Sequence, residues 1–199
     1  MGFDTITKRK TIRKFKDTKI EKEEILSLIE AAINAPSAHN FQPWEFIVVD
    51  SNEVKEKLSS RMALTWINNL KKDGKSQIEI NERINLSKWR INNAPLLIIP
   101  CFDTSKVEKY GDERDTAEFI MGVQSVALAS ENILLKATEK GLGVLWLCAP
   151  LFCPEDLRNV LSIPEHILPQ EILIIGFPDE DPIKPKRRNL NELIHLNRW

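Results

Sequence analysis

Apolar residues recur every three or four positions along several stretches of the chain, a spacing that predicts helices. The clearest stretch is 21–35, where the apolar positions follow an acidic first turn and end at Pro36, a residue that stops a helix. Between 53 and 93 sparse apolar positions continue on both sides of Asp73-Gly74, so we expect two helices separated by a turn. A short helix is expected over 154–161, with proline at its start.

The longest predicted helix, 116–140, carries apolar residues around most of its circumference. Asp115 and Glu118 match a capping box at its start, and Gly141 matches the glycine that often ends a helix. A helix that is apolar on all sides needs cover on all sides, and a chain of this size has few other helices to provide it. The pattern therefore favours a homodimer with this helix near the subunit interface. The alternative is a core helix of a monomer.

Four shorter segments predict strands: 45–50, 95–102, 144–148 and 171–176. The second and fourth are almost wholly apolar, which is typical of strands covered on both faces. Pro100 is expected to mark the end of its strand, because proline cannot donate a ladder hydrogen bond. Mixed helices and strands without repeats or a dividing linker predict one α+β domain over 1–199.

Composition excludes several classes of protein. Of 199 residues, 42% are hydrophobic and 29% charged, and the net charge of -1 gives no general reason to expect a nucleic acid as partner. Basic residues still gather at 8–16 and 184–188, which makes these two segments candidate anion sites. No apolar run is long enough to span a bilayer and the start has no signal-peptide core, so a cytoplasmic protein is expected.

The three cysteines, Cys101, Cys148 and Cys153, form no Cys-x-x-Cys pair. We therefore expect neither a disulfide framework nor a structural zinc site. Their mostly apolar neighbours indicate buried, inert thiols.

Two polar clusters flank the first predicted helix. Residues 9–15 read Arg-Lys-Thr-Ile-Arg-Lys-Phe and supply cations and a hydroxyl, which suit an anionic group such as a phosphate. Residues 35–44 read Ala-Pro-Ser-Ala-His-Asn-Phe-Gln-Pro-Trp and place polar side chains on a proline-bounded loop beside a tryptophan. That mixture suits a flat aromatic ligand with polar edges.

Together the two clusters resemble the N-terminal signature of the nitroreductase family of FMN-dependent oxidoreductases. Further blocks follow in the order of that family: Gly-Leu-Gly at 141–143, Ile-Ile-Gly-Phe-Pro at 174–178, Arg-Arg-Asn-Leu-Asn-Glu-Leu at 187–193, and a terminal Trp199. The resemblance thus covers nearly the whole chain. It implies a small mixed β-sheet flanked by helices, in a domain-swapped homodimer whose two FMN sites lie at the interface. It also implies that the tail 178–188 wraps the partner subunit.

The resemblance places Arg9, Lys10 and Thr11 near the phosphate and ribityl chain of FMN. It places Arg13 at the pyrimidine edge of the flavin, where a cation stabilises the negative charge of the reduced ring. The alternative interpretation is a solvated basic N-terminus with no ligand.

In the resembling family, Pro36, Ser37 and Asn40 match positions that reach the flavin from the second subunit. Gln42 is expected to orient this loop. His39 stands at a variable position and has no assigned role.

Leu145, Trp146 and Leu147 match the strand beside flavin N5, where a backbone N–H can hydrogen-bond that atom. This chain has no Pro-x-Glu-Gly run here, so no role of that glutamate carries over. A buried strand with no further role is compatible with the same residues.

Arg187 matches the C-terminal phosphate ligand of the family. Lys186 and Arg188 are its neighbours in the sequence, so a shift of one residue in the match would select one of them instead. Arg90 aligns loosely with a family Lys or Arg near the flavin. A solvated basic tail is the alternative for 184–188.

The implied activity is a ping-pong transfer of hydride from NAD(P)H, through flavin N5, to a nitroaromatic, a quinone or a related acceptor. No Gly-x-Gly-x-x-Gly follows a strand, so NADH or NADPH would be a transient substrate and not a Rossmann-bound cofactor. Three alternatives stay open: another reaction on the same fold (reductive dehalogenation, enone reduction or flavin destruction), a flavin-binding protein without turnover, and nucleic-acid binding by the basic clusters.

Overall fold

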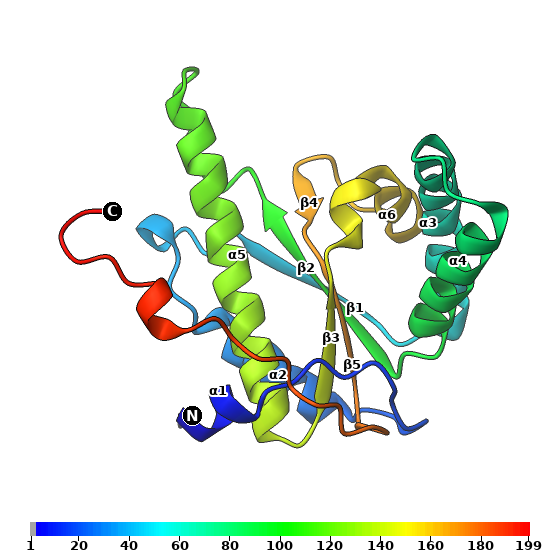
Figure 1. The fold of residues 1–199 in the computed structure, drawn as a ribbon. Helices are drawn as coiled ribbons and strands as arrows, with labels where there is room; N and C mark the ends of the chain where they lie inside the picture. The colour runs from blue at the N-terminus through cyan, green and yellow to red at the C-terminus, as the bar shows by residue number, and fades with distance from the viewer. Residues whose placement is uncertain (1–2) are drawn as a thin grey trace.

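The computed structural model describes residues 3–199, and five strands form one sheet with helices on both faces (Figure 1). The strand order is β1-β2-β5-β3, and β4 also pairs with β2. The strands are β1 (Trp44–Val49), β2 (Leu96–Asp103), β3 (Gly143–Leu147), β4 (Ile167–Pro169) and β5 (Ile172–Gly176). Four of them confirm the expected strands, whereas β4 has three residues, too few to show a sequence period.

The described strands pair only in the antiparallel sense. One parallel pairing is present, an isolated bridge between Thr11 and Val144 of β3. It adds the parallel element that a mixed sheet requires. There the backbone N–H of Ile12 donates to the carbonyl of Val144 at 3.1 Å. The N-terminal segment therefore lies along the outer edge of β3.

The main helices are α2 (Lys22–Ile33), α3 (Asn52–Lys72), α4 (Gln77–Asn92), α5 (Arg114–Glu139) and α6 (Pro154–Leu161). They confirm the helices predicted from the apolar spacing. Short helical segments complete the list: α1 (Phe3–Lys8), η1 (Ala38–Asn40), η2 (Ala149–Phe152) and η3 (Leu190–Glu192). None of the helices in the described part of the chain has both the length and the apolarity needed to cross a membrane.

The sheet separates two apolar cores. Alternating side chains of β2 point to opposite faces, so Leu96 and Ile98 pack with α2 and α5, whereas Leu97 and Ile99 pack with α3 and α6. Figure 1 shows this layering, with α2 and α5 on one side of the sheet and α3, α4 and α6 on the other. This double cover explains why the sequence of β2 is almost wholly apolar.

Pro100 does not end its strand, and that expectation is wrong. It lies inside β2, opposite Phe46 of β1. On its other side, β5 pairs only with 96–98 and β4 only with 101–103, so Pro100 faces the break between them. Its carbonyl accepts the backbone N–H of Gln170 at 3.0 Å. The proline is tolerated because the ladder is interrupted where its missing N–H would point.

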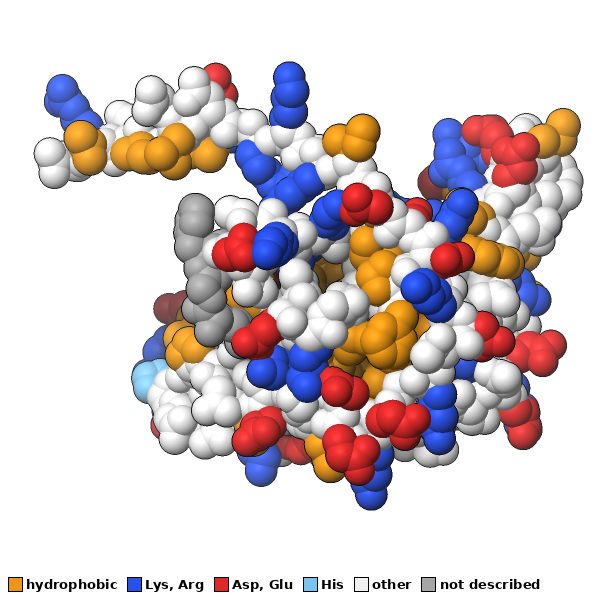
Figure 2. All heavy atoms as spheres, turned by 90° about the horizontal axis from the view of Figure 1, so that it is seen from below, with side chains coloured by type: hydrophobic (Ala, Val, Ile, Leu, Met, Phe, Trp, Pro, Cys, Tyr) orange, Lys and Arg blue, Asp and Glu red, His pale blue; other side chains and the backbone are white. Residues whose placement is uncertain are grey.

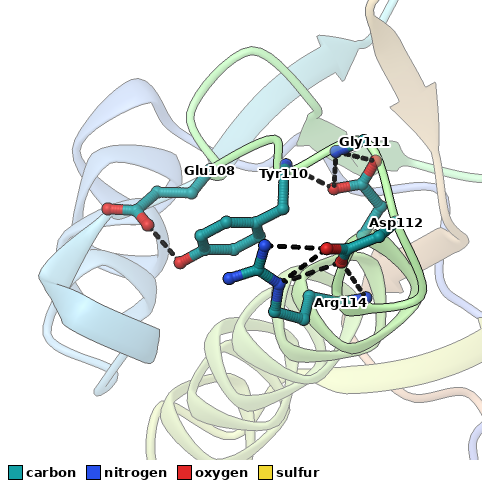
Figure 3. A network of polar contacts seen from close by, with 6 residues as sticks. Glu108, Tyr110, Gly111, Asp112 and Arg114 are labelled. Atoms are coloured by element: carbon teal, nitrogen blue, oxygen red, sulfur yellow. Dashed lines mark hydrogen bonds and ion pairs between the residues drawn. The ribbon is translucent and has the colours of Figure 1, made fainter.

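The start of α5 also differs from expectation, because Asp115 and Glu118 form no capping box. Asp112 accepts the backbone N–H of Arg114, and the carboxylate of Asp115 turns back to the N–H groups of Tyr110 (2.7 Å) and Gly111. In Figure 3 the guanidinium of Arg114 covers the Tyr110 ring, 4.1 Å from its centroid, while Glu108 accepts the tyrosine hydroxyl. The loop that connects β2 and α5 is thus held by hydrogen bonds and by the contact between Arg114 and Tyr110.

The circumference of α5 is not fully covered within one chain. Its inner face is buried against the sheet and α2, but Phe119, Ile120 and Leu128 stay about half exposed. The small inner residue Gly122 explains the close approach of β2, because an added Cβ would overlap the ring of Phe102.

The thiols of Cys101 and Cys153 are buried, and burial raises their pKa to about 12 and about 11. The prediction of buried thiols is confirmed for these two, and the raised pKa favours the unreactive protonated form. Cys148 is half-buried.

Candidate functional site

The N-terminal segment 9–16 is held in place by backbone hydrogen bonds on both sides. Beyond the contact with β3, Lys16 N–H donates to Phe177 O (2.9 Å), and Lys14 O accepts the N–H of Asp179 (3.0 Å). Gly143 allows this approach, because an added Cβ would lie 2.5 Å from Cγ1 of Ile12. Buried Ile12 anchors the segment, and the flanking cations remain nearer the surface.

The cations of this segment meet the C-terminal tail. Lys10 pairs with Asp181, and Lys184 Nζ donates to the carbonyl of Thr7 at 2.9 Å. The Nε of Arg9 lies 3.9 Å from the carboxylate of Glu131 on α5. Figure 2 shows basic side chains gathered where the tail leaves the body of the molecule. The two ends of the chain therefore converge, as their two basic clusters suggest.

Arg187 does not take part in this convergence. Its guanidinium donates to the carbonyl of Pro185 at 3.3 Å, and Arg188 donates to Glu192. Across residues 3–199, no hydrogen bond or ion pair joins Arg187 to the 9–13 segment. Among the described basic residues of the tail, Lys184 contacts the N-terminal region, at the carbonyls of Ile6 and Thr7 in α1, just before the 9–16 segment.

Arg13 has a second cation for a neighbour. Burial and the positive charge of Arg13 lower the pKa of Arg90, while Glu180 opposes the shift. Glu180 itself accepts the backbone N–H groups of Arg13 and Lys14. Within the described chain, the Arg90 side chain has neither a hydrogen bond nor an ion pair. Two guanidinium groups near each other, one without a partner, suit an anionic ligand edge.

The end of β3 carries a polar contact that sequence reasoning missed. The indole Nε1 of Trp146 donates to the carboxylate of Glu171 at 2.7 Å. Glu171 is only 5% exposed, and burial raises its pKa although Ser130 and Trp146 oppose the shift. Leu145 points into the core, whereas Trp146 stays 54% exposed. A lone acidic residue at the start of the apolar run 171–176 was the available signal.

The loop that follows α2 is strained. His39, Asn40 and Gln42 all adopt left-handed φ angles of 50°, 57° and 50°, which non-glycine residues rarely take. The hydroxyl of Ser37 accepts the backbone N–H of Gln42 at 3.0 Å, a contact that closes the loop. Ser125 on α5 holds the loop through Ala38 N–H.

This loop and the N-terminal cations lie apart in one protomer. Pro36 and Asn40 are exposed, and no hydrogen bond or ion pair within the described residues joins the loop to 9–13.

The comparisons with known proteins agree on one family. A model described as "Nitroreductase family" matches residues 6–177. A protein of Methanothermobacter thermautotrophicus, provisionally named NADH dehydrogenase/NAD(P)H nitroreductase, is 31% identical over 98% of this chain and 86% of its own. The iodotyrosine deiodinase of Thermotoga neapolitana is 30% identical over 99% of this chain and 98% of its own.

A solved structure supports the same assignment. The FMN-dependent nitroreductase of Clostridium difficile R20291 superposes with a TM-score of 0.71 at 26% identity and covers 98% of both chains. The family model spans most of the chain, and the fold and the motifs agree with it. The chain belongs to the nitroreductase family of FMN-dependent oxidoreductases.

Proposed function

We propose that the chain transfers hydride from NADH or NADPH to a nitroaromatic, a quinone or a related acceptor by a ping-pong reaction. When bound, FMN supplies the two-electron chemistry, which no side chain of the protein can perform alone. The residues of the chain bind and orient the reactants and set the charge around them. Family membership and the geometry of the basic residues support this assignment.

The donor set of the structure fits FMN. A phosphate requires cations. Among residues 3–199 the half-buried Arg9 side chain has only a long contact with Glu131, so its guanidinium can bind a ligand. Lys10 and Thr11 stand beside it for the phosphate and the ribityl hydroxyls. The proposed phosphate end thus lies where the two chain termini converge. Lys184 is a further candidate from the tail, in place of the expected Arg187.

Arg13 and Arg90 would hold the pyrimidine edge of the ring. Two guanidinium groups there favour the uptake of negative charge, because positive charge already in place costs no reorganisation when electrons arrive. The single observation that carries the proposal is the placement of Arg90, which lines a cavity beside Leu147 and has neither a hydrogen bond nor an ion pair among residues 3–199. An anionic ligand would add negative charge beside Arg90, beyond the charge that Glu180 supplies.

The end of β3 would lie beside the reactive edge. A backbone N–H near Leu147 can donate to the ring there, since a backbone role needs no particular side chain. Glu171 fixes the indole of Trp146, which forms part of the same edge. Trp146 thereby holds its position although half of it is exposed.

The site is completed by a second subunit. The uncovered apolar residues of α5 favour a homodimer, since Phe119, Ile120 and Leu128 are large and about half exposed. In that dimer, the loop with Ser37 and Asn40 would reach the flavin of the other protomer. This role would account for the left-handed backbone angles of the loop, which hold its side chains in one arrangement.

The visible spectrum of the purified protein tests the proposal. Protein loaded with FMN should be yellow, and its absorption should bleach when NADH or NADPH is added without oxygen and return on addition of a nitroaromatic. Protein that stays colourless in excess FMN would contradict the proposal. Bound flavin that neither nucleotide bleaches would indicate a binding protein without turnover.

Reductive dehalogenation is a second candidate, because the iodotyrosine deiodinase of Thermotoga neapolitana resembles the chain over nearly its whole length. Halide release from halogenated aromatics by the reduced enzyme, measured anaerobically beside nitroaromatic and quinone acceptors, separates the two reactions.

A further inference from the structure

A cavity of about 450 Å³ lies between the α3–α4 hairpin and the end of β3 with the residues that follow it. Met62 and Trp66 of α3 and Leu86 of α4 line it on one side, and Leu147 and Phe152 on the other. Small-molecule sites typically enclose about 300–1,000 Å³. The cavity therefore has room for one small ligand and not for a whole dinucleotide.

This cavity adjoins the proposed flavin region. Arg90 and Leu147 belong to both. Arg83 also lines the cavity and precedes Arg90 by seven residues, so the two lie on one face of α4 about 10 Å apart along the axis. The cavity thus extends along α4 from the flavin region towards the end of the hairpin, where Asp73 lies.

The apolar residues that line the cavity favour a ligand with a flat apolar ring. Trp66, Leu86 and Phe152 are large and apolar, yet each remains partly exposed at the cavity. Apolar side chains that stay accessible in a concave site mark a ligand-binding surface. Aromatic side chains prefer offset-stacked or edge-to-face contacts with another ring.

The charged residues that line the cavity favour a ligand that carries an acidic group. Arg83 and Arg90 are the cations of the lining, and Asp73 is its carboxylate. Arg83 has one ion-pair contact in the described chain, with Glu79 at 3.9 Å, which is long and exposed. Arg90 is the cation proposed for the flavin, which leaves Arg83 to contact a ligand at the outer end.

We propose that this cavity binds a flat aromatic electron acceptor of one or two rings that carries an acidic group, with Arg83 contacting the acid. The proposal rests on the proposed flavin reaction, because it places the acceptor beside that site. Trp66 and Phe152 bound the ring, and Arg83 selects acidic acceptors over neutral ones.

Binding of a matched pair of ligands tests the proposal. 4-Nitrobenzoate and 4-nitrotoluene have similar shapes but differ in charge, and each is titrated calorimetrically into the oxidised protein with and without FMN. We expect at least fivefold tighter binding of 4-nitrobenzoate to the FMN-loaded protein. Equal affinities, or tighter binding of 4-nitrotoluene, would overturn the proposal.

Three variants test which residue causes the preference for 4-nitrobenzoate. Arg83→Gln should weaken 4-nitrobenzoate at least fivefold and change 4-nitrotoluene less than twofold, whereas Asp73→Asn should strengthen 4-nitrobenzoate. Lys88→Gln is the matched control: it removes a cation from the same helix outside the cavity, and both affinities should persist. Arg83→Met removes the charge, keeps a side chain of similar length, and replaces Arg83→Gln if the latter melts early. A preference for the acid that survives the loss of Arg83 would refute its assigned role.

The failures of the two proposals are distinguishable. If the protein retains FMN and NADH or NADPH bleaches it, but both ligands bind alike, only the inference about the acceptor fails. If FMN does not bind while the cavity still selects 4-nitrobenzoate through Arg83, the flavin reaction fails and the cavity retains its acidic ligand.

Discussion

The indole Nε1 of Trp146 donates a 2.7 Å hydrogen bond to the buried carboxylate of Glu171 and thereby joins the end of β3 to the start of β5. The other oxygen of Glu171, Oε1, is buried without a hydrogen-bond partner in the described chain. Glu171 therefore depends on this contact, and Trp146 depends on it for its orientation.

Removing the carboxyl of Glu171 should destabilise the fold. Glu171→Ala leaves the indole N–H without its partner and opens a cavity, for an expected loss of about 1–3 kcal/mol in the free energy of unfolding. Glu171→Gln keeps an acceptor oxygen and should lose less. Urea denaturation followed by tryptophan fluorescence measures both, and equal losses would show that the hydrogen bond contributes nothing.

The pH dependence of stability should reveal the same group. Burial raises the folded-state pKa of Glu171 above its usual 4.5, so folding favours the protonated form. Its contribution is fully present below pH 4.5 and is lost as the pH rises through the folded-state pKa. The free energy of unfolding of the wild type, relative to Glu171→Gln, should therefore fall as the pH rises. A difference that stays constant or grows would show that the pKa is not raised.

The basic residues should divide into two groups by their effect on the flavin. Arg13→Ala and Arg90→Ala should lower the flavin reduction potential and slow its reduction, with a modest loss of FMN affinity. Arg9→Ala should mainly weaken FMN retention, by about tenfold or more, since a charged hydrogen bond contributes about 1.5–3 kcal/mol.

Potentiometric titration and equilibrium dialysis measure these two effects. Lys16→Ala is the control, because it removes an exposed cation of the same segment that the proposal leaves unused. If Lys16→Ala had the same effects, a general loss of positive charge would account for them.

Two glycines offer a matched test of how the N-terminal segment is positioned. An added Cβ at Gly143 meets Ile12, and one at Gly122 meets Phe102, so each alanine variant should lose about 1–3 kcal/mol of stability from overpacking. Only Gly143→Ala displaces the segment that bears Arg13, so only it should weaken FMN binding. Thermal melts and equilibrium dialysis measure the two properties. Equal loss of FMN binding in both variants would count against the positioning role.

Much of the fold was predictable because its elements carry strong periodic patterns. Helix α6 begins and ends where proline and the apolar spacing predict, and the two helices after β1 separate near Asp73. The predictions for Pro100 and Asp115 were wrong because both depend on contacts outside their own segments. Pro100 faces the break between β4 and β5, and Asp115 accepts hydrogen bonds from the loop at 110–111. Local sequence does not encode such contacts.

Part of the candidate site was likewise visible in the sequence, and part was not. The 9–13 cluster was visible as a run of cations, and the structure fixes it against β3. The proximity of Arg90 to Arg13 joins two residues 77 positions apart, so only the tertiary structure reveals it. The role proposed for Ser37 and Asn40 depends on a second chain, which one sequence indicates through the apolar positions of α5 and the family resemblance.

A crystal structure of the protein with bound FMN tests the central claim most directly. The account predicts two copies related by a twofold axis, with each flavin contacting Arg13, Arg90 and Leu147 of one protomer and Asn40 of the partner subunit. A flavin bound within a single chain away from Arg13, or a monomer that holds FMN without a second copy, would contradict it.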